Sequence, residues 1–293
     1  MSASPATLPA AAEILPGRPS ALRQLLRDPA AVLAAAILIS IALAAVFAPL
    51  LAPYDPYANA MRLRLKPIGT EGYLIGTDTQ GRDMFTRLLF GARSTLAIGF
   101  AAVLSGGIIG ATIGLLAAYY RRLDNVLMRL VDTLLSFPSI LFGLAIAAVL
   151  KPGIGSLILA LSVAAVPTIA RIARGAATVV MQQDYMEAGR AVGLGDFALI
   201  TRYLARNCAP TVLIYLTLQL GQTILLGAAL SFLGLGAQPP FAELGSMAAE
   251  GRRFLTIAPH VSTLPSLVIF TIVLCFNVLG DVLRDVLDPK LRQ

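Results

Sequence analysis

The chain has 293 residues, of which 57% are hydrophobic and only 13% are charged. Soluble domains carry about 25% charged and about 45–50% apolar residues, so this composition argues against a water-soluble enzyme. The net charge of +7 is typical of membrane proteins, which collect Lys and Arg in their cytoplasmic loops. We therefore expect the lipid bilayer as a partner and no nucleic acid.

Six stretches of 18 or more residues contain no Asp, Glu, Lys or Arg. A charged side chain at mid-bilayer costs about 2.5–3.5 kcal/mol, so such runs predict membrane spans, and lipid requires each span to be helical. In chain order the predicted spans are 31–51, 95–119, 133–150, 154–171, 211–235 and 263–281. The sequence thus predicts an all-α, polytopic membrane protein with six transmembrane helices.

The connecting segments predict the orientation. With a cytoplasmic N-terminus, 14 Lys and Arg residues lie inside and 9 outside, and the short loops decide such cases. An N-in, C-in arrangement is expected. We divide the chain into a cytoplasmic tail over 1–29, a first span with an outer amphipathic segment over 30–93, a five-helix core over 94–281 and a second cytoplasmic tail over 282–293.

Several spans contain residues that disturb or tighten helix packing. Proline removes a helical hydrogen bond, and we expect a kink or local unwinding at Pro138, Pro167 and Pro265. Glycine recurs every fourth residue from Gly106 to Gly114, which leaves a smooth strip for a neighbouring helix. This strip is consistent with tight packing or with a moving interface.

The sequence shows no catalytic or energy-supplying site. The single histidine and the position of almost every acid in a loop leave no acid, base and nucleophile together. None of the three lysines follows glycine, as a P-loop requires. Asp132 and Asp281 at span ends suit an interfacial cap or ion pair. We expect no cofactor and no metal on this chain, and a driving force from elsewhere.

Polar residues within the fifth span are candidates for a translocation path. Gln219, Gln222 and Thr223 lie in its middle, and Ser231 lies near its end. These side chains could line a path or hydrogen-bond a neighbouring helix, and both interpretations stay open at this stage.

The loop 175–209 between spans four and five is longer than a hairpin needs. Asp184 is a predicted N-cap with Glu187 three residues on, and the helix should end at Gly193 or Gly195. Asp196 can cap a second helix with one apolar face: Phe197, Ile200, Tyr203 and Leu204. The two helices should protrude into the cytosol, to fit a groove on a partner or to lie flat on the membrane.

Four motifs in order resemble the permease subunits of bacterial ABC importers of the dipeptide, oligopeptide and nickel type. Glu187-Ala188 with Gly193, Ile200 and Pro210 resembles their EAA loop. The other three motifs are LIGTD with GRD over 74–83, LSFLGLGAQPP over 230–240 and FNVLGD over 276–281. The GTD and GRD elements resemble the second permease of the pair.

The resemblance implies a second homologous permease, two cytosolic ATPase subunits that hold ATP and Mg, and an extracytoplasmic solute-binding protein. It places the chain in the bacterial cytoplasmic (inner) membrane. ATPase closure would push the loop around Glu187. The residues implied in this coupling are Asp184, Tyr185, Met186, Glu187, Ala188, Gly189, Arg190, Ala191, Gly193 and Asp196. Gly189 stands where relatives have alanine, and Arg206 where they often have proline.

The outer segment 52–93 contains a second amphipathic pattern. Hydrophobic Met84, Phe85, Leu88 and Leu89 share one helical face, and Asp83 and Arg87 on the other are spaced for an i,i+4 pair. We expect a separate helix along the outer interface. For docking the binding protein, or alternatively as a structural brace, the candidate residues are Asp78, Arg82, Asp83 and Glu243. Segment 237–262 could be a docking surface or part of an outer gate.

The leading functional interpretation is the permease subunit of an ATP-driven peptide importer. The alternatives are a self-sufficient carrier or channel, and a membrane-embedded enzyme. Dipeptides, oligopeptides, glutathione and nickel are all carried by transporters of this type. One histidine is a poor nickel site, and we expect His260 to lie in an exposed outer loop.

Overall fold

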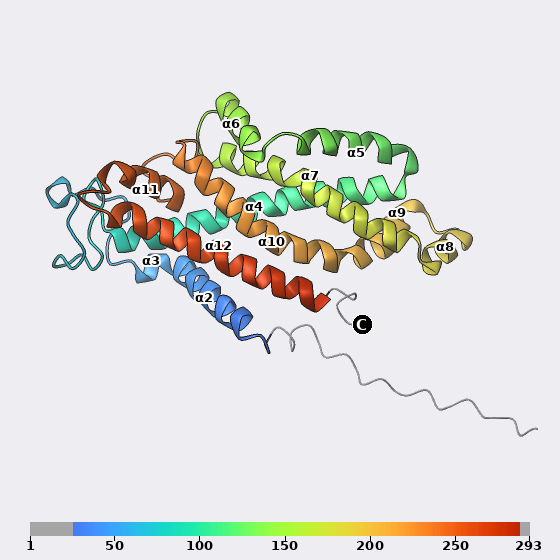
Figure 1. Cartoon of the computed structure of the whole chain (residues 1–293), viewed down its shortest axis with the longest axis horizontal. Coiled ribbons are helices and arrows are strands. Elements are labelled where there is room, and N and C mark those ends of the chain that lie inside the picture. Colours follow the sequence, from blue (N-terminus) through green and yellow to red (C-terminus); the bar gives the residue numbers. More distant parts are fainter. Residues whose placement is uncertain (1–25, 288–293) are drawn as a thin grey trace, which may run out of the picture.

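The computed structural model describes residues 26–287, and every regular element within them is helical. The helices run side by side along one long axis (Figure 1). The long ones are α2 (Pro29–Val46), α4 (Met84–Tyr119), α5 (Arg121–Leu135), α6 (Ser139–Leu150), α7 (Ile154–Met181), α10 (Ala205–Phe232) and α12 (His260–Leu287). The short ones are α3 (Ala48–Leu51), η1 (Met61–Leu63), α8 (Asp184–Ala191), α9 (Asp196–Ala198), the π-helical η2 (Leu199–Leu204), α11 (Leu244–Gly251) and η3 (Arg252–Phe254).

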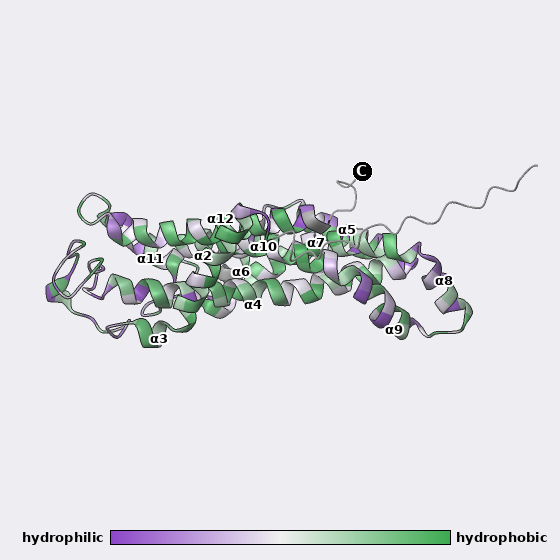
Figure 2. Ribbon diagram, turned by 90° about the horizontal axis from the view of Figure 1, so that it is seen from below, coloured by the Kyte–Doolittle hydropathy of each residue, from purple (hydrophilic) through white to green (hydrophobic). Residues whose placement is uncertain are grey.

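The two ends of the bundle differ from its middle. Segment 52–83 and α11 lie at one end and α8 with α9 at the other (Figure 1), and we refer to these as the α11 end and the α8 end. The middle is predominantly hydrophobic, and polar residues concentrate at both ends (Figure 2). This distribution is that of a protein with a hydrocarbon layer around its centre.

Five helices are long and apolar enough to cross a membrane, and a sixth crossing results if α5 and α6 count as one bent span. This confirms the prediction of an all-α, polytopic membrane protein, and five or six of the six predicted spans are long and apolar enough to cross. The first turn of α2 and the last turn of α12 both lie toward the α8 end (Figure 1). The described chain therefore starts and finishes on one side, and N-in, C-in remains a prediction about which side that is.

The third span differs from the prediction of one helix over 133–150. Here α5 ends at Leu135, α6 begins at Ser139, and the two axes meet at 87°. Pro138 precedes α6 directly, and a proline disfavours helical backbone in the residue before it. The break expected at Pro138 is confirmed, whereas α7 and α12 continue through Pro167 and Pro265.

The prediction of a separate interfacial helix before the second span is wrong. Residues from Met84 onward form the first turns of the 36-residue helix α4, and Asp83 is its N-cap, accepting from the Thr86 N–H at 2.8 Å. The predicted Asp83–Arg87 pair is also absent from this region: Arg87 is buried and its Nε lies 3.2 Å from Asp78 Oδ2. The charged face therefore points into the protein, because the carboxylate of Asp78 lies there to pair with it.

The glycine strip of α4 packs directly against the backbone of α7. A Cβ atom on Gly106 would lie 2.7 Å from the Ser162 carbonyl oxygen, and one on Gly110 would lie 2.7 Å from the Val166 carbonyl oxygen. Neither oxygen can move aside without displacing α7. The contacts therefore support tight packing, one of the two interpretations of this strip.

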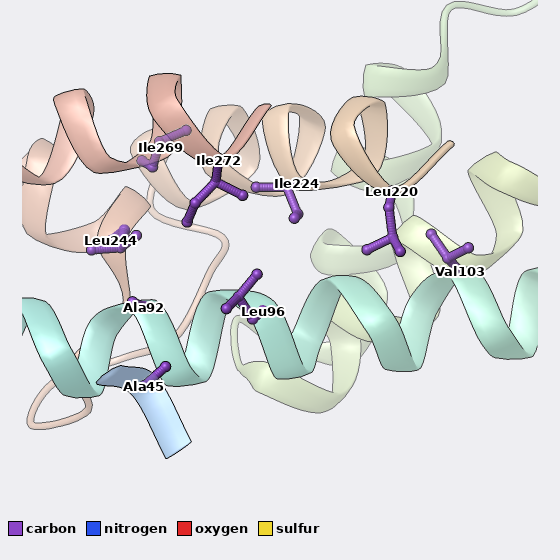
Figure 3. Packing of buried hydrophobic residues seen from close by; sticks show 9 residues of the cluster. All are labelled: Ala45, Ala92, Leu96, Val103, Leu220, Ile224, Leu244, Ile269 and Ile272. Carbon is purple, nitrogen blue, oxygen red and sulfur yellow. The ribbon is translucent and has the colours of Figure 1, made fainter. Parts of the chain in front are cut away.

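A second packing centre joins α2, α4, α10, α11 and α12 near the α11 end (Figure 3). Its buried members are all aliphatic: Ala45, Ala92, Leu96, Val103, Leu220, Ile224, Leu244, Ile269 and Ile272. Since lipid is as apolar as these side chains, close packing rather than exclusion of water holds such helices together. The first span is thereby fixed to the rest of the bundle.

Candidate functional site

The α8–α9 loop has a small core of its own. Met186, Leu199, Leu204 and Cys208 are buried together, each with at most 1% of its surface exposed. A Cβ atom on Gly189 would lie 2.8 Å from Leu199 Cδ2. The absence of a side chain at Gly189 lets α8 close onto η2. Because interiors of this kind transmit strain, the loop is a packed projection rather than a flexible tether.

The ends of α8 follow the sequence signals only in part. Gln183 occupies the N-cap, and Asp184, the predicted cap, is the first helical residue instead. Asp184 and Glu187 still place two acids in the first turn, where the helix dipole favours negative charge. The predicted stop is confirmed: α8 ends at Ala191, and Gly193 has a φ of +80°, which glycine adopts freely.

The predicted second helix is not a separate element. From Asp196 to Phe232 the chain forms one 37-residue helical unit, comprising α9, η2 and α10. Within the predicted apolar face, Leu204 is buried but Phe197 is 81% exposed. At the tip of the molecule Val192 is also exposed, by 77%. Large apolar side chains exposed outside the hydrophobic middle of the bundle mark a surface suited to a partner.

Asp196 has a contact that the sequence did not indicate. Its carboxylate accepts hydrogen bonds from the Tyr119 hydroxyl at 2.7 Å and the Tyr120 hydroxyl at 3.0 Å. The guanidinium group of Arg190 lies 5.5 Å from the centre of the Tyr119 ring, within cation–π range. The hydrogen bond to Asp196 raises the pKa of the Tyr120 hydroxyl, so this group stays a donor. We name Tyr119, Tyr120 and Asp196 the tyrosine clasp.

A hollow of about 270 Å³, lined by four polar and six apolar residues, lies where α6, α7 and α10 meet, and we name it the polar hollow for the four polar ones. Three of the four path candidates, Gln219, Gln222 and Thr223, line it together with Ser139. Ser231 does not line this hollow and is buried. It lies against α11, since a Cβ atom on Gly245 would be 2.8 Å from the Ser231 Cβ. The structure therefore brings three candidates to one cavity and places the fourth in the protein interior.

A buried charge cluster braces the α11 end. Asp78 Oδ2 accepts from Arg82 Nε at 2.6 Å and lies 3.2 Å from Arg87 Nε. Arg82 also donates to Glu250 of α11 at 3.4 Å, and burial raises the pKa of that carboxyl group. Asp78, Arg82 and Arg87 are at most 3% exposed. The cluster fastens the segment before α4 to both α4 and α11.

The candidate docking residues form no exposed surface in this structure. Asp78, Arg82, Asp83 and Glu243 are all at most 3% exposed. Glu243 is the N-cap of α11, where it accepts from the N–H groups of Gly245 at 2.9 Å and Ser246 at 2.8 Å. These contacts support the alternative of a structural brace, and docking of the binding protein at these residues stays a prediction.

The expectation that His260 lies in an exposed loop is wrong. His260 is the first residue of α12, it is 6% exposed, and its Nε2 lies 3.2 Å from the Thr77 carbonyl oxygen. The turn at Gly76 folds over it, since a Cβ atom there would lie 2.8 Å from Nε2. The side chain joins the outer segment to α12.

A second hollow, of about 450 Å³, lies between α5 and α7. Arg174 donates through Nε and Nη2 to the two carboxylate oxygens of Asp124, at 2.5 and 2.7 Å. Arg171 pairs with Asp132 beside it, which confirms the ion-pair interpretation of Asp132. Sequence reasoning missed Asp124 and Arg174, because no short spacing links residues 50 positions apart on different helices.

Sequence comparisons agree with this architecture. The profile of the family described as binding-protein-dependent transport system inner membrane component matches residues 110–293. A second profile, described as the N-terminal TM domain of oligopeptide transport permease C, matches residues 20–67. The first match alone covers more than half of the chain.

Two full-length relatives are similar to this chain. A protein of Brucella abortus, named as a peptide transport system permease, is 42% identical over 270 residues, covering 92% of this chain and 91% of the relative. The glutathione transport system permease protein GsiD of Pectobacterium atrosepticum is 41% identical over 273 residues, covering 92% and 90%.

Solved structures share the fold at lower identity. An inward-facing form of the MetNI methionine ABC transporter matches with a TM-score of 0.58 and 22% identity, over 70% of this chain and 98% of that chain. An amino acid ABC transporter matches with a TM-score of 0.52 and 18% identity, over 68% and 92%. The all-helical arrangement is thus that of ABC transporter membrane subunits.

Proposed function

This chain belongs to the family of binding-protein-dependent transport system inner membrane components, and we propose that it forms half of a translocation path for peptides. Separate ATPase subunits drive the transport. The chain is a multi-pass permease subunit of a bacterial ABC importer in the inner membrane. In our proposal its partners are a second homologous permease, two cytosolic ATPase subunits that hold ATP and Mg, and an extracytoplasmic solute-binding protein. The chain itself contributes no catalytic residue.

The observation that carries the proposed coupling is the α8–α9 loop. Its inner side is fixed by Met186 and Gly189, and its outer side exposes Glu187 in the first turn of α8. Val192 at the end of α8 and Phe197 in α9 are also exposed and offer apolar anchors for a groove on an ATPase. We place the α8 end in the cytosol, so that the ATPases push on this projection.

The test is the substitution Glu187→Lys in the complex purified with its partner subunits. Reversing the charge at the first turn of α8 opposes the helix dipole and changes the surface offered to the ATPase groove. We expect the variant to insert and to assemble with the second permease. ATP hydrolysis stimulated by the binding protein, and uptake into proteoliposomes, should both be lost.

The matched control is Glu71→Lys, the same charge change at an exposed residue of the outer segment. It should retain stimulated ATP hydrolysis and uptake. Normal uptake by the Glu187→Lys complex would overturn the coupling role of the loop.

The polar hollow supports a path for a solute with amide groups. Gln222 is exposed and lies ten residues before the end of α10, about 15 Å at 1.5 Å per residue and so near the bilayer centre. An amide in hydrocarbon would be unsatisfied, so this face of α10 must meet water, solute or protein. We propose that Gln219, Gln222 and Thr223 line the path.

We propose small peptides, glutathione among them, as the substrate class. The two relatives are named for peptide and glutathione transport, and amide and hydroxyl groups complement peptide N–H and C=O groups. Nickel is the alternative, and imidazole is the side chain that suits it. Calorimetry on the cognate binding protein with trialanine, glutathione and Ni²⁺ decides: binding of Ni²⁺ alone would overturn the peptide assignment.

A further inference from the structure

Charge rather than apolar burial holds α5 against α7. Of its 15 residues only Val131 is fully buried. The contacts to α7 include two ion pairs, in which Asp124 and Arg174 are 24% and 38% exposed and Asp132 and Arg171 are 59% and 58% exposed. Exposed ion pairs of this kind stabilise a protein only weakly. Little free energy therefore opposes separation of α5 from α7.

The ion pairs stand in line with the polar hollow. On α7, Ala164 lines the hollow and Arg171 lines the α5–α7 space, and residues seven apart lie two turns apart on one helical face. Arg171 is 17 residues from the start of α7, about 26 Å along a helix and so close to the far side of a layer of about 30 Å. The two pairs thus lie between the proposed path and the α8 end.

The connections at both ends of α5 allow it to move as a rigid helix. At its start, Tyr120 is the N-cap residue and belongs to the tyrosine clasp, which joins it to Asp196 of the α8–α9 loop. At its end, the chain breaks before Pro138 and turns by 87° into α6. Figure 1 shows α5 lying along α7, with α6 turned out of the line of α5. One end meets the coupling loop and the other is a hinge.

From these contacts we infer that α5 is the inner gate of the path. The Asp124–Arg174 and Asp132–Arg171 pairs hold the gate closed. A displacement of the α8–α9 loop reaches α5 through the tyrosine clasp, separates the pairs and opens the space below the polar hollow. This inference rests on the proposed function of the loop. Asp196, Tyr119 and Tyr120 are positioning residues in it and do not touch the solute.

Reversible cross-linking of α5 to α7 in the full complex tests the gate. Asp132→Cys and Arg171→Cys are introduced together after Cys208 and Cys275 have been changed to Ala. A short bis-methanethiosulfonate reagent then bridges the pair. We expect uptake of labelled trialanine or glutathione, whichever the binding protein binds, to be abolished by the reagent and restored by reduction. A static brace tolerates the bridge, so full uptake while cross-linked overturns the gate.

The matched control bridges α4 to α7 at the glycine strip. The hydroxyl groups of Ser105 and Ser162 lie 2.7 Å apart, and a Ser105→Cys, Ser162→Cys disulfide should leave uptake unchanged because these helices keep their packing. Loss of uptake in this control as well would mean that any bridge to α7 is harmful, and would remove the support for α5.

A charge swap gives an independent readout that needs no reagent. Arg171→Asp places two carboxylates opposite each other, and we expect ATP hydrolysis that no longer depends on the binding protein. The double variant Asp132→Arg, Arg171→Asp should restore that dependence. If both variants retain wild-type dependence, the gate is wrong even though Glu187→Lys abolishes uptake; if Glu187→Lys is harmless, the coupling function fails first.

Discussion

At the scale of single residues, one carboxylate decides the structure of the α11 end. Asp78 faces two buried guanidinium groups, at 2.6 Å from Arg82 Nε and 3.2 Å from Arg87 Nε. Glu250 provides the remaining negative charge from 3.4 Å and is itself 27% exposed. A buried pair of this kind adds little stability over apolar residues, but the loss of one partner leaves the other charge uncompensated.

We therefore expect Asp78→Asn to destabilise the protein by about 3–5 kcal/mol, since it leaves the two arginines without their main counter-charge. The measurement is thermal unfolding of the purified subunit in detergent. Glu71→Gln, an acid-to-amide change at an exposed position of the same segment, should leave the unfolding temperature unchanged. An unchanged unfolding temperature for Asp78→Asn would show that the cluster is solvated.

At the scale of elements, two glycines allow the effect of helix packing on stability to be separated from the effect of helix propensity. Gly110 lies against the backbone of α7, whereas nothing lies within 4 Å of a Cβ atom on Gly175. Both are within long helices, where glycine costs about 0.5–1 kcal/mol relative to alanine. The same substitution at the two sites therefore changes backbone entropy equally and packing differently.

We expect Gly175→Ala to stabilise the subunit by about 0.5–1 kcal/mol. Gly110→Ala should destabilise it by about 1–3 kcal/mol, the usual cost of overpacking. Unfolding temperatures of the two variants in the same detergent give the comparison. Equal shifts in one direction would contradict the close contact between α4 and α7.

The elements also show what the sequence can and cannot predict. Charge-free runs located the membrane helices, and Pro138 and Gly193 marked a break and a stop, because these signals are local. The amphipathic pattern from Met84 onward predicts a helix along the lipid interface, but the charged face of these turns meets a partner within the protein. That partner is Asp78, which a turn before α4 brings next to the charged face. Helical periodicity does not predict such a contact.

The same limit applies to the candidate site. Gln219, Gln222 and Thr223 could be selected from the sequence because they are polar residues within one predicted span, and neighbouring turns of one helix bring all three to one hollow. The tyrosine clasp joins residues 76 or 77 positions apart, and His260 is buried by a turn that lies 183 positions away. Contacts made by tertiary folding leave no pattern in one sequence.

At the scale of the whole molecule, the described chain begins and ends on the side of the α8–α9 loop (Figure 1). If that side is cytosolic, 14 of the 23 Lys and Arg residues lie inside, in keeping with the preference of cytoplasmic loops for positive charge. Two strongly exposed residues mark the opposite ends: Leu74 is 72% exposed in the outer segment and Phe197 is 81% exposed in α9.

We expect a membrane-impermeant maleimide to label Leu74→Cys but not Phe197→Cys in intact spheroplasts, in a chain whose Cys208 and Cys275 are changed to Ala. Inverted vesicles should give the opposite result. Detergent-solubilised samples, in which both sites are accessible, control for reactivity. Labelling of Phe197→Cys in intact spheroplasts would reverse the orientation.

The bare tip formed by Val192 and Phe197 has a cost before assembly. A newly synthesised subunit that has not yet bound its ATPase exposes these apolar side chains to water. Chaperones, proteases and other unassembled copies of the subunit then compete for them. Balanced synthesis of permease and ATPase would then protect both. Expression of this subunit alone should give poor recovery, and co-expression with the ATPases should rescue it.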